Sequence, residues 1–257
     1  MRRLVQKILL LWFLGVIGGG MMGCVGNYAS PNAVEAGVLA DEKAARVELR
    51  KFEAQKVKLR RPVMILAGLG DVGFHANLCR NELAERAEGE RLVVVSFFGV
   101  DDLRKCAVRA IKRAQLECGE GVEVDVIGIS MGGVVARLAA EDAAVAKEAG
   151  ASLKIRRLFT MASPLQGAKM AKLPALSRIH GQLRPGSELL TELSAREPDY
   201  EVLSYVRRGD GVVGEGRASL PGRQAMVVAT PLFQGAHWGV ITDERVVLDV
   251  LRRLGQE

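Results

Sequence analysis

Short apolar stretches alternate with stretches of helical periodicity along most of this chain, and this alternation limits the folds that it can adopt. The stretches that we interpret as strands are 62–70, 91–99, 122–130, 154–164, 200–208 and 223–231. Strands that alternate with helices build β-α-β units, which form a parallel sheet covered by helices on both faces. We therefore expect an α/β fold with a mostly parallel central sheet.

The strand 122–130 ends in a motif that can carry chemistry. Gly128-Ile129-Ser130-Met131-Gly132 matches G-x-S-x-G, and a helical pattern, 131–150, follows at once. In a nucleophile elbow the serine occupies a sharp turn between a strand and a helix, where glycines avoid crowding. The amino terminus of the helix directs its N–H groups and positive dipole toward a developing oxyanion. The alternative is an ordinary tight turn with Ser130 as a polar residue within it.

A serine nucleophile needs a base, and the chain contains three histidines. His75 follows the first glycine-rich turn, and His180 lies in an irregular stretch. His237 comes just after the last apolar strand and before the final helix, 243–255. Loops that follow parallel strands emerge at the same carboxyl edge of the sheet, so His237 is the predicted base for Ser130.

The base in turn needs a carboxylate to orient its ring. Asp210 follows the strand 200–208 and should also lie at the carboxyl edge. Asp199 is the nearest rival, but it precedes that strand and should lie at its opposite end. Asp243 has the position of a helix-capping residue. We therefore predict Asp210 as the third member of a triad.

The order Ser130, Asp210, His237 is that of the α/β-hydrolase fold, and the chain resembles that superfamily over roughly residues 60–255. The patterns around these residues resemble the lipase and esterase branch. This resemblance implies an oxyanion hole formed by the backbone N–H groups of Leu69 and Met131. Because Ala67 stands where such lipases often carry a histidine, Gly70 is the alternative donor to Leu69.

Residues 165–198 interrupt the alternation with several prolines and glycines. The lipases and esterases that this chain resembles carry a lid or cap at this position. The stretches 173–183 and 187–195 are predicted to form two short amphipathic helices that cover the active site. The alternative is a solvated connection.

The amino terminus has the pattern of an export signal. Basic residues precede an apolar run, 8–17, and small residues lead to Cys24. Met21-Met22-Gly23-Cys24 resembles the lipobox of bacterial lipoproteins, in which cleavage before the cysteine leaves it lipidated. We predict a signal peptide at 1–23, a tether with a peripheral helix at 24–59 and a catalytic domain at 60–257. A plain secretory signal or an uncleaved amino-terminal anchor is the alternative.

Composition excludes several classes of protein. Hydrophobic residues make up 49% of the 257 residues and charged residues 26%, which is typical of a folded globular protein. The net charge of +6 includes no basic block interleaved with aromatic residues, so nucleic-acid binding is not expected. Apart from Cys24, the cysteines Cys79, Cys106 and Cys118 have no zinc-site spacing and are interpreted as small buried residues. No metal or cofactor is expected.

The sequence thus favours a lipase-like serine hydrolase that cleaves carboxylic esters through an acyl-enzyme. Its expected partners are an ester or lipid substrate and, through a lipidated Cys24, a membrane surface of a bacterial cell envelope. Two alternatives stay open: a thioesterase or amidase on the same fold, and a catalytically inactive, lipid-tethered interaction domain. The sequence carries no signal for oligomeric state.

Overall fold

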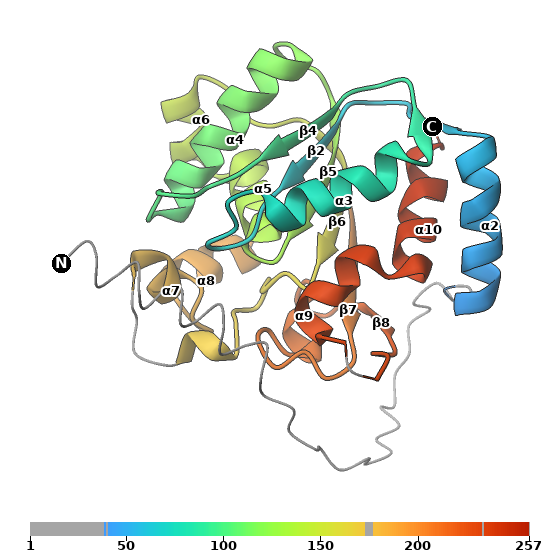
Figure 1. Ribbon diagram of the computed structural model, residues 1–257. Helices are drawn as coiled ribbons and strands as arrows, with labels where there is room; N and C mark the ends of the chain where they lie inside the picture. The colour runs from blue at the N-terminus through green and yellow to red at the C-terminus, as the bar shows by residue number, and fades with distance from the viewer. Residues whose placement is uncertain (1–38, 40, 173–176, 233, 257) are drawn as a thin grey trace. The chain divides into compact units, whose positions relative to one another are not determined.

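A parallel sheet of six strands forms the centre of the computed structural model (Figure 1). The structure describes residues 39, 41–172, 177–232 and 234–256, which belong to a single unit that begins at Glu35. The predicted signal peptide, Cys24 and the tether to residue 38 lie outside the described residues. The strands of the sheet, in spatial order, are β4 (Leu92–Val95), β2 (Val63–Leu66), β5 (Val124–Ile129), β6 (Ile155–Met161), β7 (Glu201–Arg207) and β8 (Met226–Val228).

Every neighbouring pair in this sheet is parallel, and helices pack on both of its faces. One face is covered by α4 (Leu103–Cys118), α5 (Met131–Glu141), α6 (Ala143–Ala149) and α8 (Glu188–Ser194). The other is covered by α2 (Glu42–Ala54), α3 (Phe74–Ala84) and α10 (Glu244–Leu254). Every residue of β2 and β5, in the middle of the sheet, is buried, as expected of strands covered on both faces. The predicted fold class, α/β with a mostly parallel central sheet and helices on both faces, is confirmed.

Outside the sheet the chain forms several short elements. They are β1 (Val57–Lys58), β3 (Ala87–Glu88), α7 (Arg178–Gln182), α9 (Ala236–Gly239) and the 3-10 turns η1 (Met170–Lys172), η2 (Glu215–Arg217) and η3 (Val240–Thr242). Helix α3 ends at Ala84, and the chain then becomes extended because β3 pairs with β1. The N–H of Leu59 donates to the carbonyl of Glu88, which holds the chain extended there.

The charged helix α2 is anchored to α10 by both apolar and ionic contacts. Ala45 and Leu49 are buried in the same core as α10. On the exposed side, Arg46 pairs with Glu244, and Glu48 pairs with Arg252. Burial of the two apolar residues provides most of the stabilisation, because exposed ion pairs contribute only about 0–1 kcal/mol each.

The predicted lid segment, 165–198, contains α7 and α8 where two helices were expected. The apolar side of α8, with Leu189, Leu190 and Leu193, is buried in the core beside α5. Arg137 on α5 is fully buried and donates to the carbonyl oxygens of Leu193 and Arg196. These contacts attach α8 to α5. The lid function of the segment stays a prediction.

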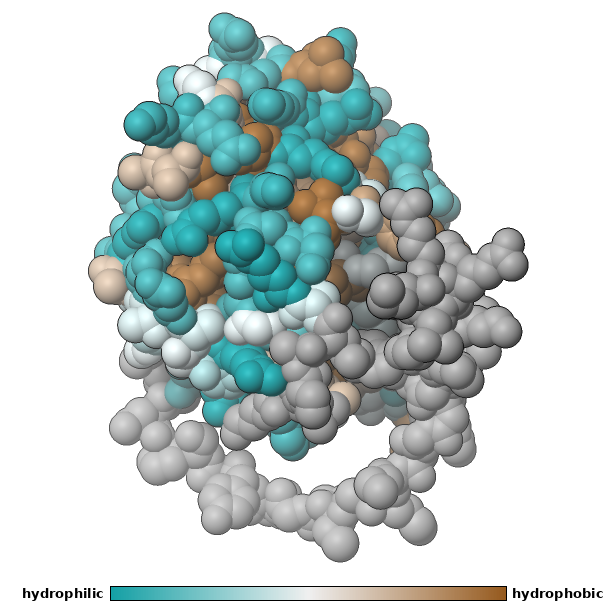
Figure 2. Space-filling model, turned by 90° about the vertical axis from the view of Figure 1, so that its left-hand side faces the viewer, coloured by the Kyte–Doolittle hydropathy of each residue, from teal (hydrophilic) through white to brown (hydrophobic). Residues whose placement is uncertain are grey.

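The surface and the thiols carry less information about function. Figure 2 shows one face on which hydrophobic residues form patches separated by hydrophilic ones. Within the described residues no helix is long and apolar enough to cross a membrane.

Cys79, Cys106 and Cys118 are free thiols. Burial raises the pKa of Cys79 and of Cys106 to about 12, so that both stay protonated at neutral pH.

A buried carboxylate interrupts the apolar side of β5. Asp125 is completely buried, and within the described residues neither of its carboxylate oxygens accepts a hydrogen bond. Burial raises its pKa to about 6, although the neighbouring charges of Arg157 and Arg61 act in the opposite direction. Ionising this group therefore costs stability in the folded chain.

This predicts a pH dependence of stability that belongs to Asp125. Because its pKa rises from 3.8 in the unfolded chain to about 6 in the folded one, its stabilising contribution is complete below pH 3.8 and is lost as the pH rises through 6. Between pH 4 and pH 7 the wild type should lose roughly 2 kcal/mol more free energy of unfolding than Asp125→Asn. Urea denaturation of both proteins at each pH measures this difference. Parallel pH profiles would contradict the assignment.

Candidate active site

Ser130 lies at the junction between β5 and α5, in a backbone conformation that residues other than glycine rarely adopt. Its φ is 50° and its ψ is −119°, in the region that favours glycine. The flanking glycines make this turn possible. A Cβ at Gly128 would lie 2.4 Å from the Cα of Gly133, and one at Gly132 would lie 2.1 Å from the carbonyl oxygen of Leu66. The turn thus brings α5 against the strands and leaves Ser130 half-buried at the carboxyl edge of the sheet.

The structure brings Ser130, His237 and Asp210 together in one hydrogen-bonded chain. His237 Nε2 lies 3.1 Å from Ser130 Oγ, and His237 Nδ1 lies 2.9 Å from Asp210 Oδ2. These residues are 107 and 27 positions apart in the sequence. The Asp210 carboxylate accepts a hydrogen bond from Nδ1–H of His237. This leaves Nε2 unprotonated and able to accept the proton of the Ser130 hydroxyl.

Asp210 is held as a carboxylate in a buried place. It is 4% exposed, and its Oδ1 accepts the backbone N–H groups of Val212 and Val213. Burial alone would raise the pKa of Asp210, but hydrogen bonds from His237 and these two N–H groups hold that pKa below its usual range. The rival residue, Asp199, is exposed and lies before β7, at the other end of the strand.

The turn after β2, which contains Leu69, lies close to Ser130. A Cβ at Gly68 would lie 3.4 Å from the Cβ of Ser130, which shows how closely this turn approaches. The N–H of Asp71 donates to the carbonyl of Gly68, and Gly70 adopts a positive φ of 73°. These are features of a β-turn with Leu69 and Gly70 at its centre. Met131, the other predicted donor, is the first residue of α5.

Asp71 connects this turn to its neighbours. It is 2% exposed, and its carboxylate accepts the N–H groups of Gly73, His75 and Ala76 at the start of α3. Its carbonyl oxygen accepts the hydroxyl of Ser96, at the end of β4. The turn is therefore anchored on both sides. Nothing in the sequence marks Asp71 for this role, because an aspartate after glycines is common in surface turns.

An aromatic contact closes the site on the α3 side. Trp238 stacks on His75 at 4.1 Å between ring centroids and meets His237 edge to face at 4.8 Å. Burial lowers the pKa of His75, which keeps its ring neutral in this stack, although Asp71 acts in the opposite direction. His75 thus supports Trp238 instead of serving as the base. The third histidine, His180, contacts the hydroxyl of Ser177 in the insert.

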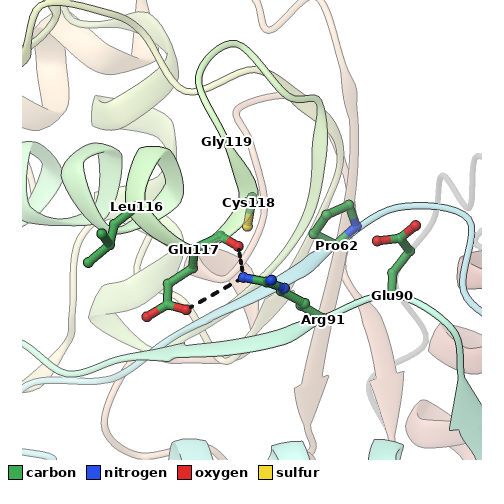
Figure 3. A pocket seen from close by; sticks show the side chains of 7 residues that line it. All are labelled: Pro62, Glu90, Arg91, Leu116, Glu117, Cys118 and Gly119. Carbon is green, nitrogen blue, oxygen red and sulfur yellow. Dashed lines mark hydrogen bonds and ion pairs between the residues drawn. The ribbon is translucent and has the colours of Figure 1, made fainter.

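A hollow of about 300 Å³ lies where β2 and β4 begin, at the end of the sheet opposite to Ser130. Figure 3 shows the side chains that line it. Its lining residues are Pro62, Glu90, Arg91 and 116–119. Arg91 crosses it to donate to the carbonyl oxygen of Glu117. In the part of the chain that the structure describes, His, Cys, Asp and Glu form no cluster that could hold a metal ion.

These features together are a parallel α/β sheet with a serine in a glycine-flanked strand-to-helix turn after β5, an acid after β7 and a histidine after β8. The sequence matches no protein-family model and no curated protein. Several solved structures are similar, among them the following two. One is a candidate cell surface hydrolase from Lactobacillus plantarum WCFS1, with 14% identity, TM-score 0.49, and 75% of this chain and 90% of that chain covered. The other is a NocB thioesterase domain in covalent complex with a fluorophosphonate nocardicin G analog, with 23% identity, TM-score 0.41, and 75% and 93% covered.

The close packing at the elbow predicts a specific loss of stability. Gly128→Ala places a methyl group against the backbone of Gly133, so β5 and α5 must separate. We expect a loss of about 1–3 kcal/mol in the free energy of unfolding, as for other overpacked sites. The control is Gly181→Ala, because that site in α7 has open space around the added methyl group. Urea midpoints that fall equally in both variants would refute the packing argument.

Proposed function

We propose that this protein is a serine hydrolase of carboxylic esters, similar to lipases. The observation that carries the proposal is the hydrogen-bonded chain from Ser130 through His237 to Asp210, with its distances of 3.1 and 2.9 Å. Serine at a strained strand-to-helix turn, with a base in contact and a buried carboxylate behind it, is the arrangement that activates a hydroxyl nucleophile.

The proposed reaction uses these groups in two steps. His237 Nε2 takes the Ser130 proton as Oγ attacks the acyl carbonyl, and the developing oxyanion is held by the N–H groups of Leu69 and Met131. His237 then protonates the leaving alcohol, and an acyl-enzyme forms on Ser130. A water molecule, deprotonated by His237, then attacks the acyl carbon. The bond between that carbon and Ser130 Oγ breaks, His237 returns the proton to Oγ, and the acid is released. Asp210 stabilises the imidazolium at both stages.

Apolar side chains beside the site support an apolar acyl group in the substrate. Val72 and Phe74 are each 67% exposed, and Phe98 is 61% exposed. Val72 and Phe98 lie on the loops that follow β2 and β4, and Phe74 is the first residue of α3. The two loops are joined by the hydrogen bond between Ser96 and Asp71. Exposed apolar residues gathered at one place are typical of binding surfaces. Their position next to the turn of Leu69 suits an ester with a hydrocarbon chain.

The triad is tested by removing its members one at a time. Ser130→Ala and His237→Ala should each lower hydrolysis of p-nitrophenyl esters about 10⁴-fold or more, with the fold unchanged. Asp210→Asn should be severely impaired, whereas the matched control Asp199→Asn should keep its activity, since Asp199 is exposed at the opposite edge. Labelling by a fluorophosphonate should be lost in Ser130→Ala.

Substrates then separate the alternatives. A series of esters from short to long chains, compared with thioesters and amides of the same acyl groups, gives the preferred bond from kcat/KM. Undiminished hydrolysis by Ser130→Ala would overturn the enzyme assignment. A wild type that neither reacts with fluorophosphonate nor hydrolyses any of these compounds would instead favour an inactive interaction domain.

We further propose that the protein is exported and held at a membrane surface of the cell envelope by lipids on Cys24. The support is the order of basic, apolar and small residues before this cysteine. One acyl chain binds membranes only marginally, and stable attachment takes more than one. The expected lipoprotein modification supplies several chains, which would keep the catalytic domain close to a bilayer.

Metabolic labelling with a palmitate analogue tests the anchor. Label should be present in the wild type, should persist in the control Cys118→Ser and should be absent from Cys24→Ser. The wild type should also stay in the membrane fraction through a high-salt wash, and its intact mass should place the mature amino terminus at residue 24. A labelled Cys24→Ser, or a mature wild type that begins elsewhere, would exclude the lipoprotein proposal.

A further inference from the structure

A buried arginine stands directly before the loop that carries Asp210. Arg207 is the last residue of β7 and is only 3% exposed. Its carbonyl oxygen accepts the N–H of Asp210 at 3.3 Å. Arginine is rarely buried to this extent unless its guanidinium is paired, so its partners show what it is doing there.

Its partners precede and follow His237 in the sequence. After His237, Asp243 Oδ2 lies 3.1 and 2.9 Å from Arg207 Nε and Nη2. Before His237, Gln234 Oε1 accepts a hydrogen bond from Arg207 Nη1 at 2.7 Å. Between these two points lies α9, which contains His237 and Trp238. One rigid guanidinium fork therefore holds both ends of the histidine segment.

The guanidinium also touches the backbone of α9 itself. A Cβ at Gly239 would lie 2.1 Å from Arg207 Nη1 and 2.8 Å from its Cζ. Gly239 has an ordinary helical φ of −65°, so a glycine is needed there for space and not for its conformational freedom. This glycine lets the segment of His237 lie directly on the arginine.

We propose that Arg207 is a positioning residue, which sets the place of His237 relative to Asp210 and Ser130. This inference rests on the proposed function. Asp210 and His237 follow different strands. Arg207 contacts Asp210 through its backbone, and its side chain contacts the segment that carries His237. A displacement of about 1 Å at a reacting group can cost a factor of about 100 in rate, so such a brace has a direct effect on catalysis.

Arg207→Lys is the first test, because it keeps the positive charge but loses the fork that spans Gln234 and Asp243. We expect kcat, and the rate of fluorophosphonate labelling of Ser130, to fall about 10–100-fold, with KM little changed. The low-field proton resonance of the hydrogen bond between His237 and Asp210 should shift or broaden. A residue that only stabilised the fold would lower the melting temperature without changing kcat, the labelling rate or this resonance.

Arg245→Lys is the matched control. Arg245 binds the same carboxylate, with its Nε 2.9 Å from Asp243 Oδ1, but it does so from α10 and otherwise reaches the carbonyl of Ala229. It should keep kcat and the proton resonance of the wild type. If Arg207→Lys behaves like this control, the proposal is wrong.

Gln234→Ala covers the case in which Arg207→Lys does not fold. Gln234 is exposed, so its loss leaves the buried pair of Arg207 and Asp243 intact. A reduced kcat and an altered proton resonance in Gln234→Ala support the proposal. A kcat and a resonance equal to those of the wild type overturn it. Should the wild type fail to react with fluorophosphonate, the proposed function fails, and the resonance alone then tests whether Arg207 sets the contact between His237 and Asp210.

Discussion

The arrangement of the site depends on a main-chain contact too close for any side chain to intervene. β5, α5 and the end of β2 meet at Gly128, Gly132 and Leu66, where an added Cβ would lie within 2.1–2.4 Å of a backbone atom. Only under this constraint can Ser130 adopt its positive φ and present its hydroxyl at the sheet edge. The cost of the strained conformation is offset by the packing of two buried strands and a buried helix around it.

The rest of the site is assembled around this fixed point by loops that differ in their support. The turn with Leu69 is anchored by Asp71, which caps α3 and is bound by Ser96. The loop with Asp210 continues directly from β7. The segment with His237 forms the short helix α9, and it is held by the side chain of Arg207 and by the packing of Trp238. Buried polar contacts of this kind strengthen one another in the low dielectric of the interior, which favours one geometry.

The sequence was a good guide to the sheet and a weaker one to what surrounds it. The strands were predictable because each is a continuous apolar run bounded by glycines or charges. β1 and β3 were missed, because each has two residues and forms only by pairing with the other. Helix α2 was predictable from its spacing, but its docking on α10 was not, since its ion pairs join residues about 200 positions apart.

What the sequence by itself determined is the edge at which the chemistry can occur. Ser130, Asp210 and His237 each follow an apolar strand, and parallel strands place their carboxyl ends together, so local pattern and topology suffice. Only the tertiary structure decided how these side chains are held. Arg207 reads in the sequence as half of a basic pair with Arg208, yet it is buried while Arg208 is exposed. Which of two adjacent arginines faces the core depends on partners 27 and 36 positions away, and that information is absent from any local stretch of the chain.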